Sequence, residues 1–183
     1  VEANLQKANC KNVTFTALDM TRSQLDGALL QEADLTGSTL HGATLVEANL
    51  AGADMTNTVC TGAKLSRSQM QRCVLTGADL TEATLTQADL SGAEALSGTK
   101  FVGANLQKAN CENVTFTAVD MTNATMSGVK LSRARLASAT LCEAELQGAD
   151  LTGADVTTAD LSGANLTGAK LEGVTGLDTA TLT

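Results

Sequence analysis

The chain has 183 residues, no Pro, Trp or Tyr, and a formal net charge of −8. This charge disfavours direct binding to nucleic-acid phosphates or to an anionic membrane surface. No apolar run approaches the roughly 18 residues of a membrane-spanning helix, and no signal peptide is visible. We therefore expect no direct contact with nucleic acid and no membrane span.

One apolar residue recurs every five positions along the chain. We call it the central residue and number its neighbours from −2 to +2. Central residues run from Leu5 to Leu90, resume one residue late from Leu96 to Leu171, and end after a second late step at Leu177 and Leu182. Position −2 is usually Ala, position −1 is often Asp or Asn, and 15 of the 16 glycines lie at position +2. Such regularity indicates one elongated repeat domain rather than several globular ones.

A period of five fits neither an amphipathic helix, with a period of 3.6, nor a long strand, with a period of two. The pattern instead predicts a three-residue strand from position −2 to the central residue, followed by a two-residue corner. The side chains at both ends of the strand would face inward and the one at position −1 outward. Layers of Ala and Leu would then fill the interior and leave no lumen for a ligand.

The units ADL at 33–35, ADL at 78–80 and ANL at 164–166 resemble the A-D/N-L-x-x pattern of pentapeptide-repeat proteins. The resemblance covers essentially all of the chain. It implies an all-β fold, a right-handed quadrilateral β-helix with four pentapeptides per coil. Residues 1–183 would then form a single domain of about nine coils, about 43 Å long at the spacing of paired strands.

Two stretches in the chain are nearly identical. Residues 3–21, ANLQKANCKNVTFTALDMT, reappear as residues 104–122, ANLQKANCENVTFTAVDMT, which we interpret as duplication of whole coils. The one-residue register slips fall near residues 91–100 and 172–177, and on a four-sided coil both predict small bulges on the same side. A bulge can accommodate an insertion or re-aim a surface for a partner, and the sequence leaves both open.

Neither end of the repeat has a capping segment in this sequence. A solenoid normally covers its terminal coils, because they present unpaired strand edges. We therefore expect the domain to be part of a longer chain. The alternative is end-to-end stacking of uncapped coils.

The cysteine pattern does not suggest a disulfide framework. Cys10, Cys60 and Cys111 are central residues and Cys73 lies at position −2, where a thiol packs as a small hydrophobe. Only Cys142, at position +1, should face outward. Unpaired thiols favour a reducing compartment, which suggests the cytoplasm.

The sequence indicates no catalytic, cofactor-binding or metal-binding site. His41, the only histidine, is an outward residue with no nucleophile fixed beside it by any motif. Cys10 and Cys111 lie five layers apart, too far to share a metal ion. Stacked carboxylates such as Asp34 and Asp54 could bind Ca²⁺, but the Gly-Asp ligand loops of metal-binding β-helices are missing. We expect a protein that is not an enzyme and needs no cofactor.

Charge is distributed unevenly over the four expected sides. The first and second sides, which begin at Leu5 and Cys10, sum to +1 and 0, whereas the third and fourth, which begin at Phe15 and Met20, sum to −4 and −5. Two adjacent sides therefore predict an acidic edge, although Asp is also simply common at position −1 of this repeat. The candidate partner-binding residues on this edge are Asp19, Asp34, Asp54, Asp79, Glu82, Asp120, Glu143, Asp155 and Asp160.

These features favour a non-enzymatic scaffold that presents a rigid rod and an acidic edge to an unknown, basic protein partner. The family resemblance implies an alternative, because some members mimic DNA and act as inhibitors or protectors of a type II topoisomerase. Those relatives tend to be rich in Phe at central positions and to dimerise through a C-terminal cap, whereas this chain has three Phe. Charge density also argues against mimicry, since about 43 Å of duplex carries roughly 25 phosphates and the two acidic sides hold 12 carboxylates and three cations.

Overall fold

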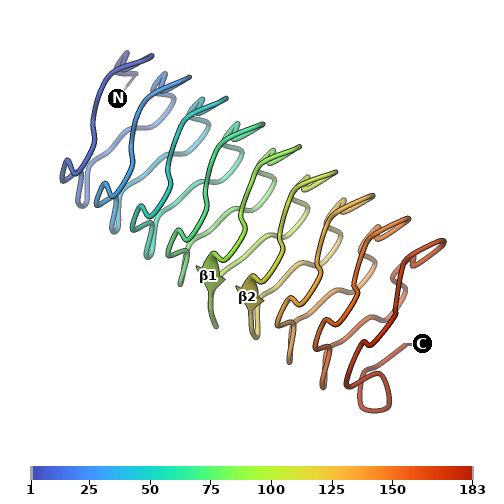
Figure 1. Ribbon diagram of the computed structural model, residues 1–183. Helices are drawn as coiled ribbons and strands as arrows, with labels where there is room; N and C mark the ends of the chain where they lie inside the picture. The colour runs from blue at the N-terminus through green and yellow to red at the C-terminus, as the bar shows by residue number, and fades with distance from the viewer. Residues whose placement is uncertain (1, 183) are drawn as a thin grey trace.

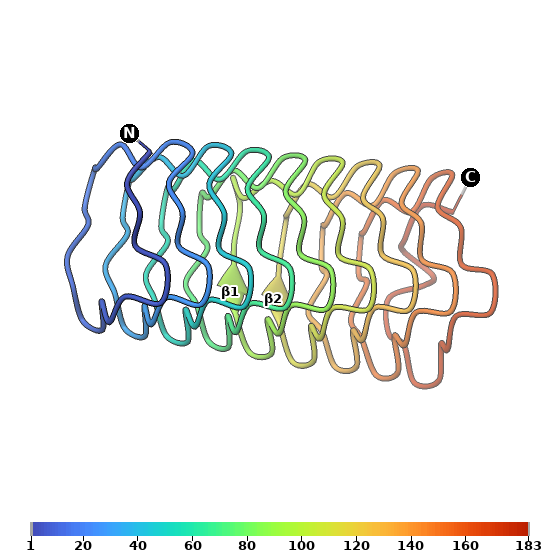
Figure 2. The ribbon, with the colours of Figure 1, turned by 90° about the horizontal axis from the view of Figure 1, so that it is seen from above.

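The computed structural model describes residues 2–182, which stack coil upon coil into an all-β rod with its termini at opposite ends (Figures 1 and 2). Two stretches are long enough to be strands, β1 (Glu94–Ala95) and β2 (Thr115–Phe116), and they pair in parallel. Elsewhere the layers are joined by single parallel bridges, most of them between residues 20 positions apart, the length of four repeat units, as in Asn9↔Leu29, and 21 apart across the register slips. No helix lies among residues 2–182, and therefore none that could cross a membrane.

The flat part of each unit is shorter than the three residues expected. Bridges form at position −1, and the central residue already begins the corner: the Ala8 N–H, for example, donates to the Leu5 carbonyl at 3.0 Å. Position +2 then turns the chain with a positive φ, 65° at Gly27 and 57° at Lys7. Glycine suits this position because it has no Cβ to clash in the left-handed region.

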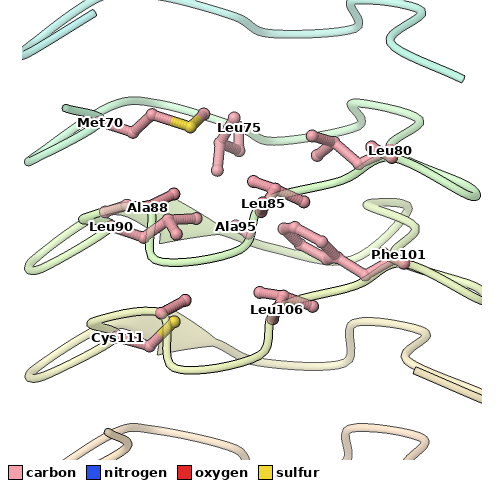
Figure 3. Packing of buried hydrophobic residues seen from close by; sticks show 14 of the residues in the cluster. Met70, Leu75, Leu80, Leu85, Ala88, Leu90, Ala95, Phe101, Leu106 and Cys111 are labelled. Atoms are coloured by element: carbon pink, nitrogen blue, oxygen red, sulfur yellow. The ribbon is translucent and has the colours of Figure 1, made fainter. Parts of the chain in front are cut away.

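The interior consists of central and −2 side chains packed in layers (Figure 3). Leu75, Leu80 and Leu85 are fully buried, which confirms the inward assignment at these positions. Each such leucine contributes about 1.5–3 kcal/mol through burial. The rings of Phe101 and Phe116 pack in a tilted arrangement with centroids 5.3 Å apart.

The predicted register is wrong at the first slip. Ala95 takes the inward place and is fully buried, whereas Leu96 is 42% exposed. Leu96 nevertheless begins the corner, since its carbonyl accepts the Thr99 N–H at 3.1 Å. The two roles of a central residue are thus split between neighbours, and the bridge offset grows from 20 at Val74↔Glu94 to 21 at Asp79↔Lys100.

The second slip also differs from its predicted register. Gly176, not Leu177, occupies the central position, because the Val156 N–H donates to the carbonyl of Thr175 just as central residues do elsewhere. The carbonyl of Gly176 accepts both the Thr179 and the Ala180 N–H groups, so this corner is one residue wider. A Cβ at Gly176 would lie 2.4 Å from the Thr157 backbone, so the tight contact requires glycine.

All five cysteines are free thiols. Cys10, Cys60, Cys73 and Cys111 are buried, and Cys142 is half-buried. Desolvation by burial raises the pKa of Cys60 and of Cys73 to about 12. These two thiols therefore stay protonated and unreactive at neutral pH.

Candidate interaction surface

The Asp or Asn at position −1 has a structural task that explains the A-D/N-L pattern. Its Oδ1 atom accepts a hydrogen bond from the backbone N–H of the residue at position +1, as in Asp54 to Thr56 at 2.9 Å and Asn105 to Gln107 at 3.0 Å. All 15 Asp and Asn residues at position −1 make this bond. Short polar side chains commonly satisfy turn backbone in this way. We call it the corner cap.

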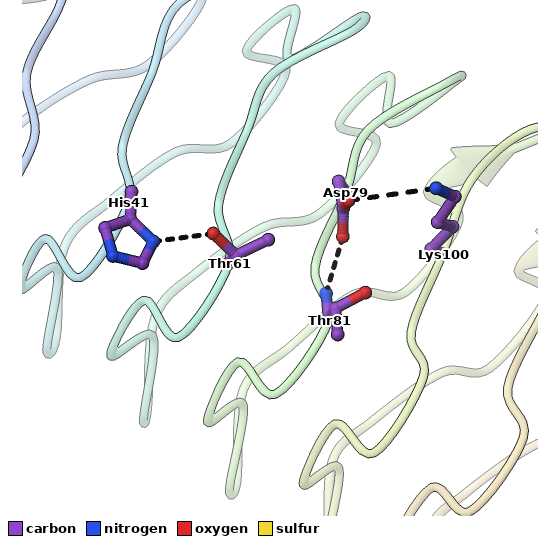
Figure 4. A network of polar contacts seen from close by, with 5 residues as sticks. All are labelled: His41, Thr61, Asp79, Thr81 and Lys100. Carbon is purple, nitrogen blue, oxygen red and sulfur yellow. Dashed lines mark hydrogen bonds and ion pairs between the residues drawn. The ribbon is translucent and has the colours of Figure 1, made fainter.

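The corner cap completes the backbone hydrogen bonding of a unit. In the unit of Leu80, the N–H groups of residues 79, 80 and 82 donate to neighbouring coils, and that of Ala83 donates back to Leu80. The fifth backbone N–H of the unit, that of Thr81, donates to Asp79 Oδ1 at 3.0 Å (Figure 4). An acidic or amide side chain at position −1 thus has a structural role, whether or not it also contacts a partner.

Seven of the nine predicted interaction residues are corner caps. They hold the backbone N–H of Thr or Ser two residues ahead: Asp19, Asp34, Asp54, Asp79, Asp120, Asp155 and Asp160. The other two, Glu82 and Glu143, are exposed at position +2 with φ of 58° and 56°. The sequence signal for this task was the spacing itself, Asp or Asn two residues before the corner.

The structure brings only some of the predicted residues together. Asp34 and Asp54 are bridge partners in neighbouring layers, and the Thr16 hydroxyl donates to Asp34 Oδ2 at 3.1 Å. On the adjacent side Lys100 lies between Asp79 and Asp120, with its Nζ 3.9 Å from Asp79 Oδ2. The acidic edge is therefore interrupted by a cation near its middle.

The remaining aspartates of the edge are not bridge partners of one another. Asp155 is bridged to Arg135 in the preceding layer, and Asp160 to Thr140. Asp160 also lies beside Cys142, whose thiol pKa is raised chiefly by its hydrogen bond with that carboxylate. Sequence reasoning had placed Cys142 outward but did not pair it with Asp160.

The corner hydrogen bonds stabilise the charged form of several carboxylates. The hydroxyl and then the backbone N–H of Thr36 lower the pKa of Asp34, and those of Thr157 lower the pKa of Asp155. Ser162 lowers the pKa of Asp160 in the same manner. Hydrogen bonds donated to a carboxylate favour its ionised form, so these side chains are negatively charged at neutral pH.

A polar hollow of ≈ 370 Å³ on the second side was not predicted. Six residues from three neighbouring layers line it: Glu112, Asn113, Ser132, Arg133, Asp150 and Thr152. Asp150 in this hollow caps Thr152 and pairs with Lys170 at 3.3 Å. Most of its lining residues hold positions +1 and +2 of units 20 residues apart, so this spacing could have located the hollow in the sequence.

The only histidine, His41, contacts a hydroxyl group in the neighbouring layer. His41 Nδ1 lies 2.7 Å from the Thr61 hydroxyl in the next layer (Figure 4). Within residues 2–182, no group of three or more His, Cys, Asp or Glu side chains is arranged to hold a metal ion.

The structure resembles solved proteins of known fold. A trypsin-treated variant of QnrB1, a plasmid-mediated fluoroquinolone resistance protein, matches with a TM-score of 0.73 and 22% identity, over 92% of this chain and 78% of that one. A second trypsin-treated QnrB1 variant gives a TM-score of 0.60 and 19% identity, over 97% and 89% of the two chains. At this identity the likeness concerns the fold alone.

HetL, a pentapeptide repeat protein involved in heterocyst differentiation regulation in the cyanobacterium Nostoc, is 27% identical over 99% of this chain and 90% of its own. Its TM-score is 0.38. No curated protein matches the sequence.

The family comparison is specific. The model described as pentapeptide repeats matches residues 1–31, 23–59, 33–72, 58–94, 96–133, 120–157 and 141–175. The matches cover nearly the whole chain, and the corner caps give the repeat a physical basis. The chain belongs to the pentapeptide-repeat family.

Proposed function

We propose that the chain is a non-enzymatic scaffold that docks a basic protein partner along its acidic edge. We further propose the finer architecture on which this depends, a right-handed quadrilateral β-helix of about nine coils, and a reducing compartment such as the cytoplasm. The 20-residue bridge offset and the free thiols support these two points.

One observation carries the docking proposal: at some corners, unlike those of Asp34 and Asp79, the cap engages one carboxylate oxygen and leaves the other without a partner. Asp54 and Asp120 use Oδ1 for the cap, and their Oδ2 atoms have no partner among residues 2–182. A charge held in this way on a rigid frame loses little side-chain freedom on binding, which favours recognition. Charge complementarity of this kind also steers association with a basic partner.

The lining of the hollow supports a scaffold rather than an enzyme. Its side chains include neither His nor Cys, and its Asp150 is engaged by Thr152 and Lys170. Catalytic sites usually combine a nucleophile or base with an orienting partner in a cleft that excludes water.

Substitution of Asp by Asn gives a sharp test, because Asn keeps the Oδ1 acceptor and removes the charge. The edge variant carries Asp54→Asn, Asp120→Asn and Asp160→Asn. The matched control carries Asp26→Asn, Asp89→Asn and Asp150→Asn, the same charge change on the first and second sides. Proteins captured from lysate by the wild-type chain and both variants would be compared at low and moderate salt.

The proposal predicts that salt-sensitive basic partners bind the wild type and the control but are lost from the edge variant. Equal capture by all three chains would contradict it. Loss from both variants would show that net charge matters, not the edge.

Membership of the pentapeptide-repeat family, some members of which resemble DNA in shape and charge, keeps protection of a type II topoisomerase as a second candidate. The interruption of the edge by Lys100 and the spacing of the remaining carboxylates weaken it, since duplex DNA carries one charge per about 1.7 Å. A gyrase supercoiling assay tests it: inhibition, or relief from a quinolone, would favour DNA mimicry over the scaffold.

A further inference from the structure

The polar hollow on the second side contains side chains that the rest of the structure leaves unpaired. Glu112 and Arg133 line it from neighbouring layers, yet neither forms an ion pair with any of residues 2–182. The amide of Asn113 and the hydroxyl of Ser132, which also line it, have no hydrogen-bond partner among these residues. We propose that the hollow binds a small zwitterion, a molecule that carries both an ammonium group and a carboxylate, as amino acids and dipeptides do.

The hollow forms because the side chain at position 132 is short. Three layers earlier, the same position on the second side is Gln71, whose Nε2 donates to Asp89 Oδ2 in the next layer at 2.7 Å. Ser132 makes no such bridge to Asp150, the counterpart of Asp89 in the described part of the chain. The space between these two layers therefore stays open to a ligand.

Arg133 extends along the hollow because the next layer has a glycine beside it. A Cβ at Gly153 would lie 3.6 Å from Arg133 Cγ, so the aliphatic part of the arginine side chain passes over the bare glycine. The Arg133 side chain is exposed, and its planar guanidinium can bind a carboxylate through two parallel hydrogen bonds. The hollow thus offers a preformed site for the anionic end of a ligand.

The charges of the hollow favour a ligand that carries both signs. Asp150 is already engaged by the Thr152 N–H at 3.1 Å and by Lys170 Nζ at 3.3 Å, so Glu112 and Arg133 supply the charges that remain for a ligand. An anion alone would pair with Arg133 but lie near the carboxylates of Glu112 and Asp150. A cation alone would pair with Glu112 but lie near Arg133. A zwitterion avoids both conflicts, because each of its charged groups has an opposite charge to bind.

The size and polarity of the hollow fit a small, weakly bound molecule. Its volume of ≈ 370 Å³ lies toward the lower end of the range for ligand pockets. Asn113 and Arg133 are exposed, so water competes for the polar groups. We therefore expect a dissociation constant on the order of 1–10 mM. The hollow lies on the second side, so this proposal does not depend on the acidic edge.

An NMR titration of residues 1–183 with glycylglycine tests the site, because this dipeptide carries one ammonium group and one carboxylate. N-acetylglycine and glycinamide are the matched probes, which keep only the carboxylate or only the ammonium group. At constant ionic strength, glycylglycine should cause saturable shifts of the backbone amides around the hollow, those of residues 112–113, 132–133 and 150–152. We expect it to bind about threefold to fivefold more tightly than either single-charge probe, the gain from one additional exposed ion pair.

Variants assign each charge to its residue. Arg133→Gln should reduce glycylglycine binding to the level of glycinamide, and Glu112→Gln to that of N-acetylglycine, because each variant leaves one charge for the ligand. Ser132→Gln keeps every charge but introduces the side chain that bridges two layers at Gln71, so it should abolish the shifts. Arg72→Gln, the same change three layers away, is the matched control and should bind as the wild type does. Circular dichroism should show the same fold for all four variants.

The proposal is overturned if glycylglycine causes no saturable shift, if a single-charge probe binds as tightly as glycylglycine, or if Ser132→Gln binds like the wild type. Loss of binding in Arg72→Gln would overturn it as well, because net charge rather than the hollow would then govern the association. None of these results bears on partner docking, since the acidic edge lies on the third and fourth sides.

Discussion

Removing a corner cap should destabilise the protein more than removing its charge. At position 54, Asp→Ala deletes the acceptor of the Thr56 N–H, a 2.9 Å bond, whereas Asp→Asn keeps an Oδ1 atom in the same place. Comparable losses of a capping side chain cost about 0.5–2 kcal/mol of unfolding free energy. Thr56 is half-buried, so water partly replaces the lost acceptor and we expect about 1 kcal/mol for Asp54→Ala.

The effect becomes clearer when distant caps are removed together. Asp54, Asp120 and Asp155 lie at least two layers apart, about 10 Å at the spacing of paired strands, so their contributions should add. The triple Ala variant should then lose about 3 kcal/mol, and the triple Asn variant less than about 0.5 kcal/mol per site. Urea denaturation followed by circular dichroism measures both.

The comparison isolates the hydrogen bond from the charge, since both triple variants remove the same three carboxylates. If the Ala and Asn variants were equally stable, the caps would contribute nothing and the reasoning would be refuted.

Four further predictions follow from the packing and the corner geometry. Leu80→Ala, in the filled interior, should lower the unfolding free energy by about 2–5 kcal/mol in urea denaturation. Leu96→Ser should change it by less than about 0.5 kcal/mol, whereas Ala95→Leu should cost about 1–3 kcal/mol through overpacking; the reverse order would restore the register predicted from the sequence. Ala118→Gly should raise the melting temperature, because residue 118 has a φ of 56° and glycine avoids the roughly 1–2 kcal/mol cost of the left-handed region. Hydrogen bonds from the Thr152 hydroxyl and N–H, and then Lys170, lower the pKa of Asp150 to about 2. The stabilising contribution of Asp150 is therefore complete above the unfolded pKa of about 3.9 and is lost as the pH falls toward the folded value. In an acid titration, the Asp150→Asn variant should lose less stability than the wild type over that pH range.

The sequence predicted the interior well because burial leaves a direct trace in residue type. Leu75 and Leu80 are fully buried as expected, and the family assignment is confirmed. A five-residue period with small and large apolar residues alternating admits few other arrangements. The register slips were harder, because Leu96 looks like any central residue and nothing in its type shows that Ala95 would take the inward place.

The surface was predicted only in outline. Charge counts by side identified an acidic edge, but they could not show that its aspartates also hold the chain. That task depends on the direction of a backbone N–H two residues ahead, which a count of charges does not show, as for Asp34 and Thr36 at 3.0 Å. The contact between Asp79 and Lys100 also depends on the first slip, which sets their offset at 21 rather than 20.

The fold and the surface both depend on position −1 carboxylates that are bound to their own corners and stay ionised. A carbon-detected NMR titration of the aspartate carboxyl groups tests it most directly. We expect midpoints below the ordinary value of 3.8 for Asp34, Asp155 and Asp160, because their corner hydroxyl and N–H groups stabilise the charged form. Midpoints at or above 3.8 for these three residues would contradict it.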